Sequence, residues 1–265
     1  MDNLQIFALA VLQGLTEFLP ISSSAHLVLL PQLLNWPDQG LVFDVAVHFG
    51  SLIAVVFYFR AEVLSMLTAW IGSISGGQSN RDSQLAWWII IGTLPAVCAG
   101  FLLQGEIESQ LREPWVVAAA SIGFGLLLWF ADATARRDRD EFQLCLRDVL
   151  LIGFSQALAL IPGTSRSGIT MTAGLLLGLS RQAAARFSFL LAIPVIFASG
   201  VLESVRMFTQ VSPISWGDLL LGVVLSAISA GLCIHYFLRL VERLGMLPFV
   251  VYRVLMGVVI LALLA

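Results

Sequence analysis

Two polar segments interrupt long apolar stretches of this chain, and both contain residue types that bind phosphate groups and transfer protons. The first holds an amide, a carboxylate, three hydroxyls and an imidazole: Gln13, Glu17, Ser22, Ser23, Ser24 and His26. The second holds two glycines, three hydroxyls and a guanidinium: Gly163, Thr164, Ser165, Arg166, Ser167 and Gly168. Serine is a typical residue at the start of a helix, where free N–H groups and the helix dipole attract anions, and arginine adds a planar fork of donors. The two segments together predict a site for a multiply charged anion such as phosphate.

The spacing within the first segment places side chains in pairs. Gln13 and Glu17 lie four residues apart and share one face of a helix. Ser23 and His26 lie three residues apart and share a face of the next helix. Together with Arg166, these groups suit phosphoryl transfer, in which catalysis depends mainly on positioning and charge stabilisation. Glu17, helped by Gln13, is the predicted oxygen ligand for a divalent cation, Mg²⁺ or Ca²⁺.

A structural alternative assigns no chemistry to these residues. An ionised side chain at membrane depth costs about 2.5–3.5 kcal/mol, so Glu17 and Arg166 need a compensating partner. They could form a buried ion pair that only locks the two segments together. That alternative leaves His26 and the cluster of hydroxyl groups without a role, so the residue set favours a catalytic site.

The two segments are related by an internal repeat with an offset of 143 residues. This offset superimposes Gln13 on Gln156, Leu15 on Leu158, Ser22 on Ser165 and Ser24 on Ser167. Interrupted apolar segments in corresponding halves of a membrane protein indicate an inverted repeat with a site near the middle of the bilayer. The sequence therefore predicts a single membrane domain, residues 1–265, with repeat halves of about 1–131 and 132–265.

Composition and hydropathy predict an all-α, polytopic membrane protein. Hydrophobic residues make up 58 % of the chain and charged residues only 12 %, about half of the usual charged fraction. Six stretches are apolar and long enough to cross a bilayer: about 41–59, 87–104, 115–131, 186–206, 216–237 and 247–265. Residues 3–34 and 147–180 are apolar at both ends but broken in the middle, so each is predicted to be a re-entrant hairpin of two half-helices.

Arginines predict the orientation of this arrangement. Ten lie in segments 60–86, 132–147, 181–186 and 238–246, which are predicted to be loops on one side. The other side has Arg112, Arg206 and the acidic residues Glu106, Glu108 and Glu113. The positive-inside rule places the first side in the cytoplasm. The first hairpin then enters from the outer face and the second from the cytoplasm.

Several other features have simpler interpretations. Basic residues do not cluster with aromatics, so we expect no nucleic-acid partner. Cys98, Cys145 and Cys233 lack the spacing of a zinc site or a disulfide framework. His48, within a predicted span, is interpreted as a packing histidine in preference to a residue that lines the site. Arg253, in the last span, is predicted to form a structural ion pair or to snorkel.

The two motifs resemble those of the bacitracin-resistance, undecaprenyl-diphosphate phosphatase family. Residues 13–26 are similar to its acidic and serine-histidine segment, and residues 162–168 to its PGxSRSG segment; the likeness covers nearly the whole chain. It implies hydrolysis of undecaprenyl diphosphate to the lipid carrier of peptidoglycan synthesis, with a divalent cation, in the bacterial inner membrane at a site opening to the periplasm. Gln13 stands where the family's first carboxylate lies, which leaves Glu17 as the only acid of that pair.

The resemblance also implies roles for individual residues. It makes Ser23 or His26 the nucleophile or base, and Ser165, Arg166 and Ser167 part of a phosphate-binding loop. The sequence does not decide whether Ser23, His26 or a metal-bound water attacks phosphorus. Because broken helices in inverted repeats are typical of transporters, a carrier that flips polyprenyl phosphate is the alternative function. Both functions require the lipid bilayer and a polyprenyl lipid, and the formation of a homodimer is left open.

Overall fold

The computed structural model describes residues 1–102, 113–207 and 215–264, except the side chains of 205–207. Eleven α-helices and two short 3-10 turns account for most of these residues, and no strand occurs among them. The α-helices of the first half are α1 (Asn3–Phe18), α2 (Ser23–Leu33), α3 (Leu41–Tyr58), α4 (Arg60–Ile74), α5 (Arg81–Leu102) and α7 (Pro114–Thr134). Those of the second half are α8 (Leu146–Ala157), α9 (Arg166–Leu176), α10 (Arg181–Met207), α11 (Trp216–Leu244) and α12 (Leu247–Leu264), with 3-10 turns η1 (Glu141–Gln143) and η2 (Leu158–Leu160).

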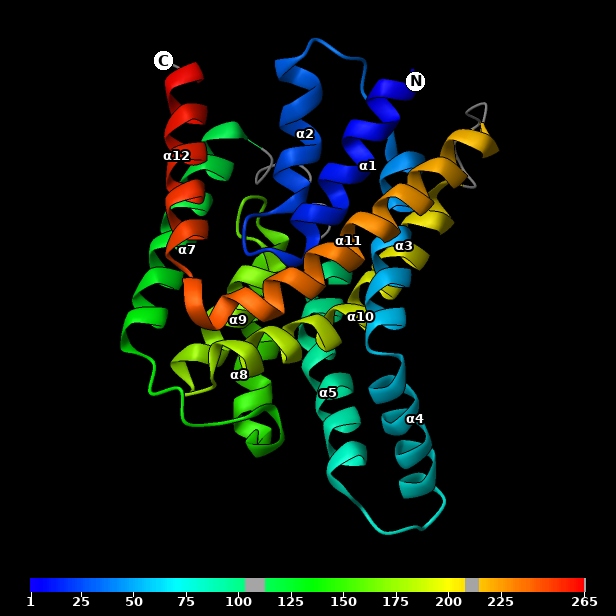
Figure 1. Ribbon diagram of the computed structural model, residues 1–265, viewed down its shortest axis with the longest axis vertical. Coiled ribbons are helices and arrows are strands. Elements are labelled where there is room, and N and C mark those ends of the chain that lie inside the picture. The colour runs from blue at the N-terminus through cyan, green and yellow to red at the C-terminus, as the bar shows by residue number, and fades with distance from the viewer. Residues whose placement is uncertain (103–112, 208–214, 265) are drawn as a thin grey trace.

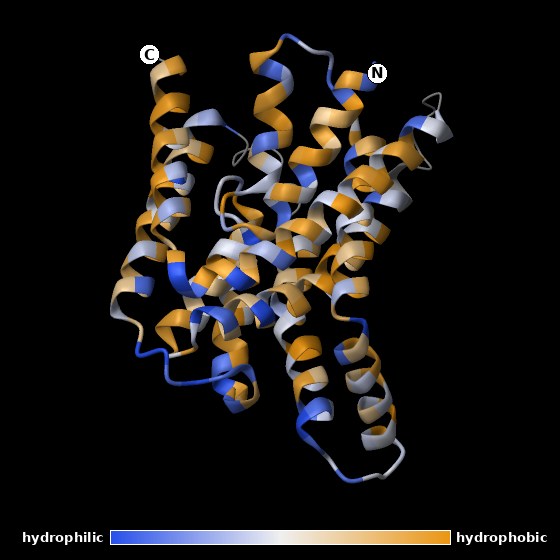
Figure 2. Cartoon of the chain, in the orientation of Figure 1, coloured by the Kyte–Doolittle hydropathy of each residue, from blue (hydrophilic) through white to orange (hydrophobic). Residues whose placement is uncertain are grey.

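Within the described residues, six helices are long and apolar enough to cross a membrane: α3, α5, α7, α10, α11 and α12. Each overlaps one of the predicted spans, so the all-α polytopic membrane fold is confirmed. Residues 103, 104 and 265, which the predicted spans include, lie outside the described residues. Hydrophobic residues predominate along these helices, whereas hydrophilic residues gather at the connections in the lower part of the molecule (Figure 2).

The remaining helices near the centre form two helix–break–helix hairpins, α1–α2 and α8–α9. Helix α1 enters from the end that holds both termini, whereas α8 enters from the opposite end, and the breaks lie near the middle of the molecule (Figure 1). Helix α1 ends at Phe18 because Pro20 has no N–H to continue the helix and restricts Leu19 to an extended conformation, with φ −73° and ψ 146°. These hairpins agree with the predicted helical ranges, while the division into repeat halves stays a prediction.

The segment 60–86, predicted to be a loop, is the main error in the predicted fold. It contains α4 and the first turn of α5, which lie side by side and project together from the lower end of the molecule (Figure 1). Trp70 and Trp87 meet edge to face, with ring centroids 5.8 Å apart, and Glu62 forms an ion pair with Arg186 at 3.5 Å. Helix α4 was missed because it is short and mixes polar with apolar residues, so hydropathy alone does not reveal it.

The connections with the ten arginines lie towards the same, lower end of the molecule (Figure 1). Ion pairs tie them together: Arg181 binds Asp132 with two donors at 2.6 and 2.9 Å, and Arg139 binds Asp148 at 2.5 Å. Arg112, Glu106, Glu108 and the side chain of Arg206, expected on the other side, lie outside the described residues. The structure thus groups the arginines, and their cytoplasmic location stays a prediction.

Candidate active site

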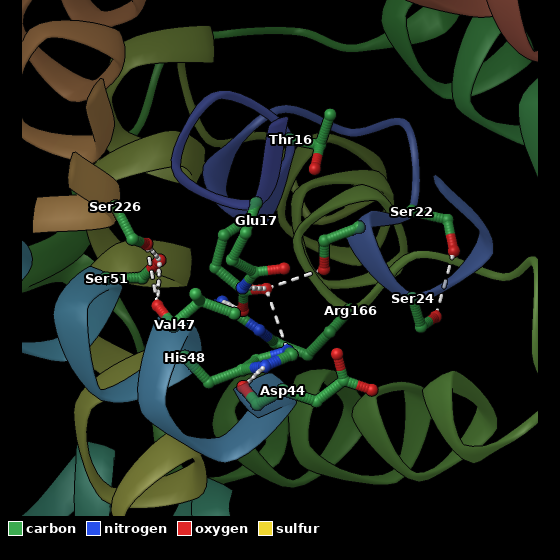
Figure 3. Close-up of polar contacts among 12 residues, drawn as sticks. Thr16, Glu17, Ser22, Ser24, Asp44, Val47, His48, Ser51, Arg166 and Ser226 are labelled. Carbon is green, nitrogen blue, oxygen red and sulfur yellow. Dashed lines mark hydrogen bonds and ion pairs between the residues drawn. The ribbon is translucent and has the colours of Figure 1, made fainter. Parts of the chain in front are cut away.

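Glu17, in the last turn of α1, is the centre of a polar network where the two hairpins meet (Figure 3). Its side chain is almost completely buried, with a residue exposure of 9 %. Oε1 accepts a hydrogen bond from Arg166 Nη2 at 3.0 Å. Oε2 accepts from Ser23 Oγ at 2.6 Å and from Gln13 Nε2 at 3.0 Å. The carboxylate is therefore bound by groups from both hairpins.

Arg166 is the first residue of α9 and connects three elements. Nη2 binds Glu17, and Nη1 donates to the carbonyl oxygen of Ser188 on α10 at 3.1 Å. The buried Glu17–Arg166 ion pair that the structural alternative requires is present. It is part of a larger network, however, because Ser23 and Gln13 bind the same carboxylate.

The serines at the two breaks have related conformations. Ser22 and Ser165 each precede the second helix of a hairpin and have positive φ values, 72° and 69°. Ser165 Oγ caps α9 by accepting from Gly168 N at 3.2 Å. Ser22 forms no side-chain cap on α2, and its hydroxyl lies 3.3 Å from that of Ser24 (Figure 3). The backbone N–H groups in the first turn of α2 therefore have no side-chain cap, unlike those of α9.

Carbonyl groups in the loop of the second hairpin bind Arg253, so only some polar groups of this loop face Glu17. Arg253 Nη2 donates to the carbonyl oxygens of Gly163 and Thr164 at 3.0 and 2.8 Å. Ser167 Oγ donates to the carbonyl oxygen of Leu19 at 2.8 Å. Of the residues predicted to bind phosphate in this loop, Gly163, Thr164 and Ser167 therefore hold the two breaks and α12 together in this structure.

The structure also corrects the prediction for Arg253. This residue is fully buried at 0 % exposure, which excludes snorkelling. The ion pairs of the described part of the chain do not include it. Backbone carbonyls satisfy the guanidinium instead, and sequence spacing could not reveal them because they belong to a loop about 90 residues earlier.

His26 has partners other than Ser23, although the two share a face of α2. Its Nδ1 lies 2.7 Å from the carbonyl oxygen of Ser22 and its Nε2 lies 2.5 Å from the hydroxyl of Tyr252. A carbonyl oxygen can only accept, so Nδ1 carries a proton, and in the neutral ring Nε2 accepts from Tyr252. The hydroxyl of Ser23 binds Glu17 instead. Glu17 is therefore the base within reach of Ser23, and Tyr252 is a site residue that the sequence did not identify.

His48 lies beside the site, contrary to its interpretation as a packing residue. Its Nδ1 donates to the carbonyl oxygen of Asp44 at 2.7 Å, and its Nε2 lies 3.6 Å from Glu17 Oε2 (Figure 3). The side chain is one-third exposed. One signal could have identified it: an ionisable residue within a membrane span is more often functional than structural.

The donor set near Glu17 fits a cation that shares its ligands with a substrate. The described residues contain no group of three or more His, Cys, Asp or Glu side chains placed to hold a metal ion. The Oε1 atom of Gln13, however, is buried without a hydrogen-bond partner, because its amide nitrogen faces Glu17. Mg²⁺ is commonly bound by one or two carboxylates together with substrate phosphates. Glu17 and Gln13 can supply the protein's part of such a site.

The fold defines an integral membrane protein in which two opposed helical hairpins meet at a buried polar network around Glu17 and Arg166. The chain belongs to the bacitracin resistance protein BacA family, which it matches over residues 6–259. It is 59 % identical to undecaprenyl-diphosphatase 2 of Stutzerimonas stutzeri (strain A1501), over 99 % of this chain and 98 % of that protein. It is 57 % identical to undecaprenyl-diphosphatase 1 of Pseudoalteromonas translucida (strain TAC 125), over 97 % of each chain. A further relative, undecaprenyl-diphosphatase of Chromohalobacter salexigens, is also 57 % identical, over 98 % of each chain. The family resemblance of the two motifs is confirmed.

Proposed function

We infer that this protein hydrolyses undecaprenyl diphosphate to undecaprenyl phosphate and inorganic phosphate. The activity regenerates a lipid carrier for cell-wall synthesis and gives bacitracin resistance. The relatives and the family match this chain along nearly its whole length, and their names support this inference. The structural observation behind it is the network in which Glu17 binds Ser23 from its own hairpin and Arg166 from the other.

In the proposed mechanism, the terminal phosphoryl group lies between Arg166 and the uncapped start of α2. Both favour negative charge, the guanidinium through its forked donors and the helix through its free N–H groups. Arg166 remains anchored on Ser188 through Nη1, so it can bind phosphate without losing its position. The negative charge of the bound substrate would then replace part of the interaction that Glu17 makes with Arg166 when no substrate is bound.

Ser23 is the proposed nucleophile and Glu17 its general base. Their 2.6 Å contact is within the distance for proton transfer between a nucleophile and its base. Ser23 Oγ forms a bond to the terminal phosphorus, the bond from phosphorus to the bridging oxygen breaks, and undecaprenyl phosphate leaves. The hydroxyl proton passes to Glu17. A water molecule then hydrolyses the phosphoserine, which restores Ser23 and releases inorganic phosphate.

A divalent cation, Mg²⁺ or Ca²⁺, is proposed to bind Glu17 and Gln13 Oε1 together with substrate oxygens. When bound there, it would neutralise charge on the diphosphate and polarise the bond that breaks. His48 and Arg166 flank the same carboxylate, so they limit the directions from which a cation can approach it.

The protein is proposed to lie in the bacterial inner membrane with its site open to the periplasm. The grouping of arginines at one end supports a cytoplasmic location for that end by the positive-inside rule. Helix α2 runs from the central break towards the opposite end (Figure 1). A diphosphate bound at the start of α2 would therefore enter from the periplasmic side.

Phosphate release tests this function directly. Purified protein in detergent, without a membrane gradient, should release inorganic phosphate from undecaprenyl diphosphate, and EDTA should slow the release. Ser23→Ala should remove most of the activity, whereas Ser73→Ala, a matched change on α4 where the hydroxyl binds only Trp70 and Trp87, should retain it. Movement of polyprenyl phosphate across sealed vesicles with no phosphate release would instead support a carrier.

A further inference from the structure

His48, on α3, places one ring nitrogen beside the carboxylate of Glu17. The other ring nitrogen, Nδ1, lies 2.7 Å from the carbonyl oxygen of Asp44, which can only accept, so Nδ1 carries a proton. In the neutral ring Nε2 then has a lone pair, and this atom lies 3.6 Å from Glu17 Oε2 (Figure 3). A histidine that binds a metal ion typically donates its other ring N–H to a backbone carbonyl or a carboxylate. The ring of His48 is therefore fixed in the tautomer that can bind a cation through Nε2.

The distance between His48 Nε2 and Glu17 Oε2 suits two ligands of one ion better than a hydrogen bond. An N–H···O bond spans about 2.7–3.2 Å, and the observed 3.6 Å is longer. Two ligand atoms that each lie about 2.0–2.2 Å from a tetrahedral ion are separated by roughly 3.4 Å. Both atoms are acceptors when the ring is neutral, so a cation shared between them would attract both.

The side chain of Gln13 offers a third ligand atom to the same carboxylate oxygen. It is completely buried, at 0 % exposure, and its Oε1 has no hydrogen-bond partner. The amide nitrogen lies 3.0 Å from Glu17 Oε2, so a half-turn of the amide would bring Oε1 beside that atom. Arg166 binds the other carboxylate oxygen, Glu17 Oε1, at 3.0 Å, and its positive charge disfavours a cation there. A cation at Oε2 would instead have both Gln13 and His48 as neighbours.

Helix α11 sets the positions of His48 and Glu17 relative to each other. The helices that carry them, α3 and α1, both approach α11 closely at glycines. A Cβ atom on Gly14 would lie 2.0 Å from a side-chain oxygen of α11, and one on Gly50 would lie 2.4 Å from a carbonyl oxygen of α11. Ser226 of α11 also donates to the carbonyl oxygen of the residue before His48 at 2.6 Å (Figure 3). The separation of Nε2 and Oε2 is therefore built on close contacts between helices.

We propose that His48 Nε2 is a ligand of the cation site, together with Glu17 Oε2 and Gln13 Oε1. The proposal rests on the proposed function, because oxygens of the substrate complete the coordination of the ion. Imidazole nitrogen binds transition-metal ions such as Zn²⁺ better than it binds Mg²⁺ or Ca²⁺, which prefer oxygen ligands. The site therefore favours a transition-metal dication, whereas Mg²⁺ and Ca²⁺ bind it through oxygen alone.

Pulsed electron paramagnetic resonance of bound Mn²⁺ tests the nitrogen ligand without requiring turnover. The ion is added to purified wild-type protein in detergent together with methylenediphosphonate, which resists hydrolysis. A histidine nitrogen on the ion should give a ¹⁴N coupling that becomes a ¹⁵N coupling when the three histidines of the chain are labelled. Oxygen ligands alone, as expected if His48 only pairs its charge with Glu17, would overturn the proposal. So would the absence of bound Mn²⁺.

Paired variants assign the coupling to one histidine. His48→Gln removes the ring nitrogen, whereas His235→Gln makes the same change on α11, where the ring packs against Tyr58 and Tyr236. His48→Gln should abolish the nitrogen coupling and weaken Zn²⁺ binding about tenfold or more, measured by competition with Mn²⁺, with little change for Mg²⁺. His235→Gln should match wild type. A coupling that persists in His48→Gln, or an unchanged Zn²⁺ affinity, would overturn the assignment.

The outcomes separate this proposal from the proposed function. Phosphate release from undecaprenyl diphosphate by a protein whose bound ion has only oxygen ligands would overturn the role of His48 alone. If wild-type protein released no phosphate with Mg²⁺, Ca²⁺ or Zn²⁺, the proposed function would fail instead. The Mn²⁺ spectra would still report which side chains bind the ion, and the isotope comparison in wild-type protein does not depend on the folding of any variant.

Discussion

Ser22 and Ser165 lie 143 positions apart and both have positive φ values, 72° and 69°. Each precedes the second helix of its hairpin, and each hydroxyl lies 3.3 Å from that of the serine two residues later. Serine in this region costs about 1–3 kcal/mol relative to an ordinary conformation. A positive φ at both positions gives the two breaks a related backbone geometry.

The two serines should nevertheless respond differently to replacement by alanine. Ser165 Oγ caps α9 through Gly168 N, whereas Ser22 forms no side-chain cap. Ser165→Ala should therefore lower the free energy of unfolding by about 1 kcal/mol, and Ser22→Ala by much less. Thermal unfolding of both variants in detergent measures the difference. Equal losses would mean that the cap on α9 contributes nothing of its own.

Close packing at Gly163 predicts a second contrast. Gly163 has φ 91°, and a Cβ atom there would lie 2.3 Å from the carbonyl oxygen of Val117. Gly76 has a similar φ of 88° but nothing within 4 Å of the same position. Gly163→Ala should cost about 2 kcal/mol or more, from strain and overlap, whereas Gly76→Ala should cost only the strain, about 1 kcal/mol. Unfolding midpoints check this, and similar losses would show that the contact with Val117 relaxes freely.

Local features made the hairpins predictable from sequence. Pro20 has no N–H and must end α1, and Gly163 supplies the positive φ that the second break requires. Apolar length identified the six spans. Helix α4 was missed because it spans only 15 residues and mixes polar with apolar residues, so its hydropathy does not distinguish it from a loop.

Distant partners explain what the sequence could not reveal at the site. Helical spacing placed Ser23 and His26 on one face, but it could not show that Ser23 binds Glu17 while His26 binds Tyr252, 226 residues later. His48 was assigned to packing for the same reason, since its proximity to Glu17 depends on how α3 packs against α1. The residue types of the site could therefore be predicted from the sequence, whereas their hydrogen-bond partners could be identified only from the fold.

Arg166 should not tolerate replacement by lysine. Its two terminal nitrogens bind Ser188 and Glu17 at the same time, and a single ammonium group cannot keep that anchor while it binds phosphate in a forked geometry. Arg166→Lys should therefore reduce turnover nearly as much as Arg166→Ala. Phosphate release in detergent compares the two. A lysine variant with most of the wild-type activity would favour the purely structural ion pair.

Glu17 and Gln13 should differ in their effect on the cation requirement. Glu17→Gln removes the only carboxylate of the pair and the base for Ser23, so activity should be lost even at high Mg²⁺ or Ca²⁺. Gln13→Ala removes a neutral ligand and should raise the cation concentration needed for half-maximal activity only modestly. Metal titrations of both variants test this. Substantial activity in Glu17→Gln would exclude both roles for the carboxylate.

The identity of the attacking group can be read from a covalent adduct. If Ser23 attacks, as its contact with Glu17 favours, rapid quenching with radiolabelled substrate should trap an acid-stable phosphoserine that is absent from Ser23→Ala. His26→Asn should slow the reaction without removing this adduct, because His26 binds Ser22 and Tyr252 and not Ser23. An acid-labile phosphohistidine would identify His26 as the nucleophile. If no adduct formed in any variant and the rate followed cation occupancy, a metal-bound water would be the attacking group.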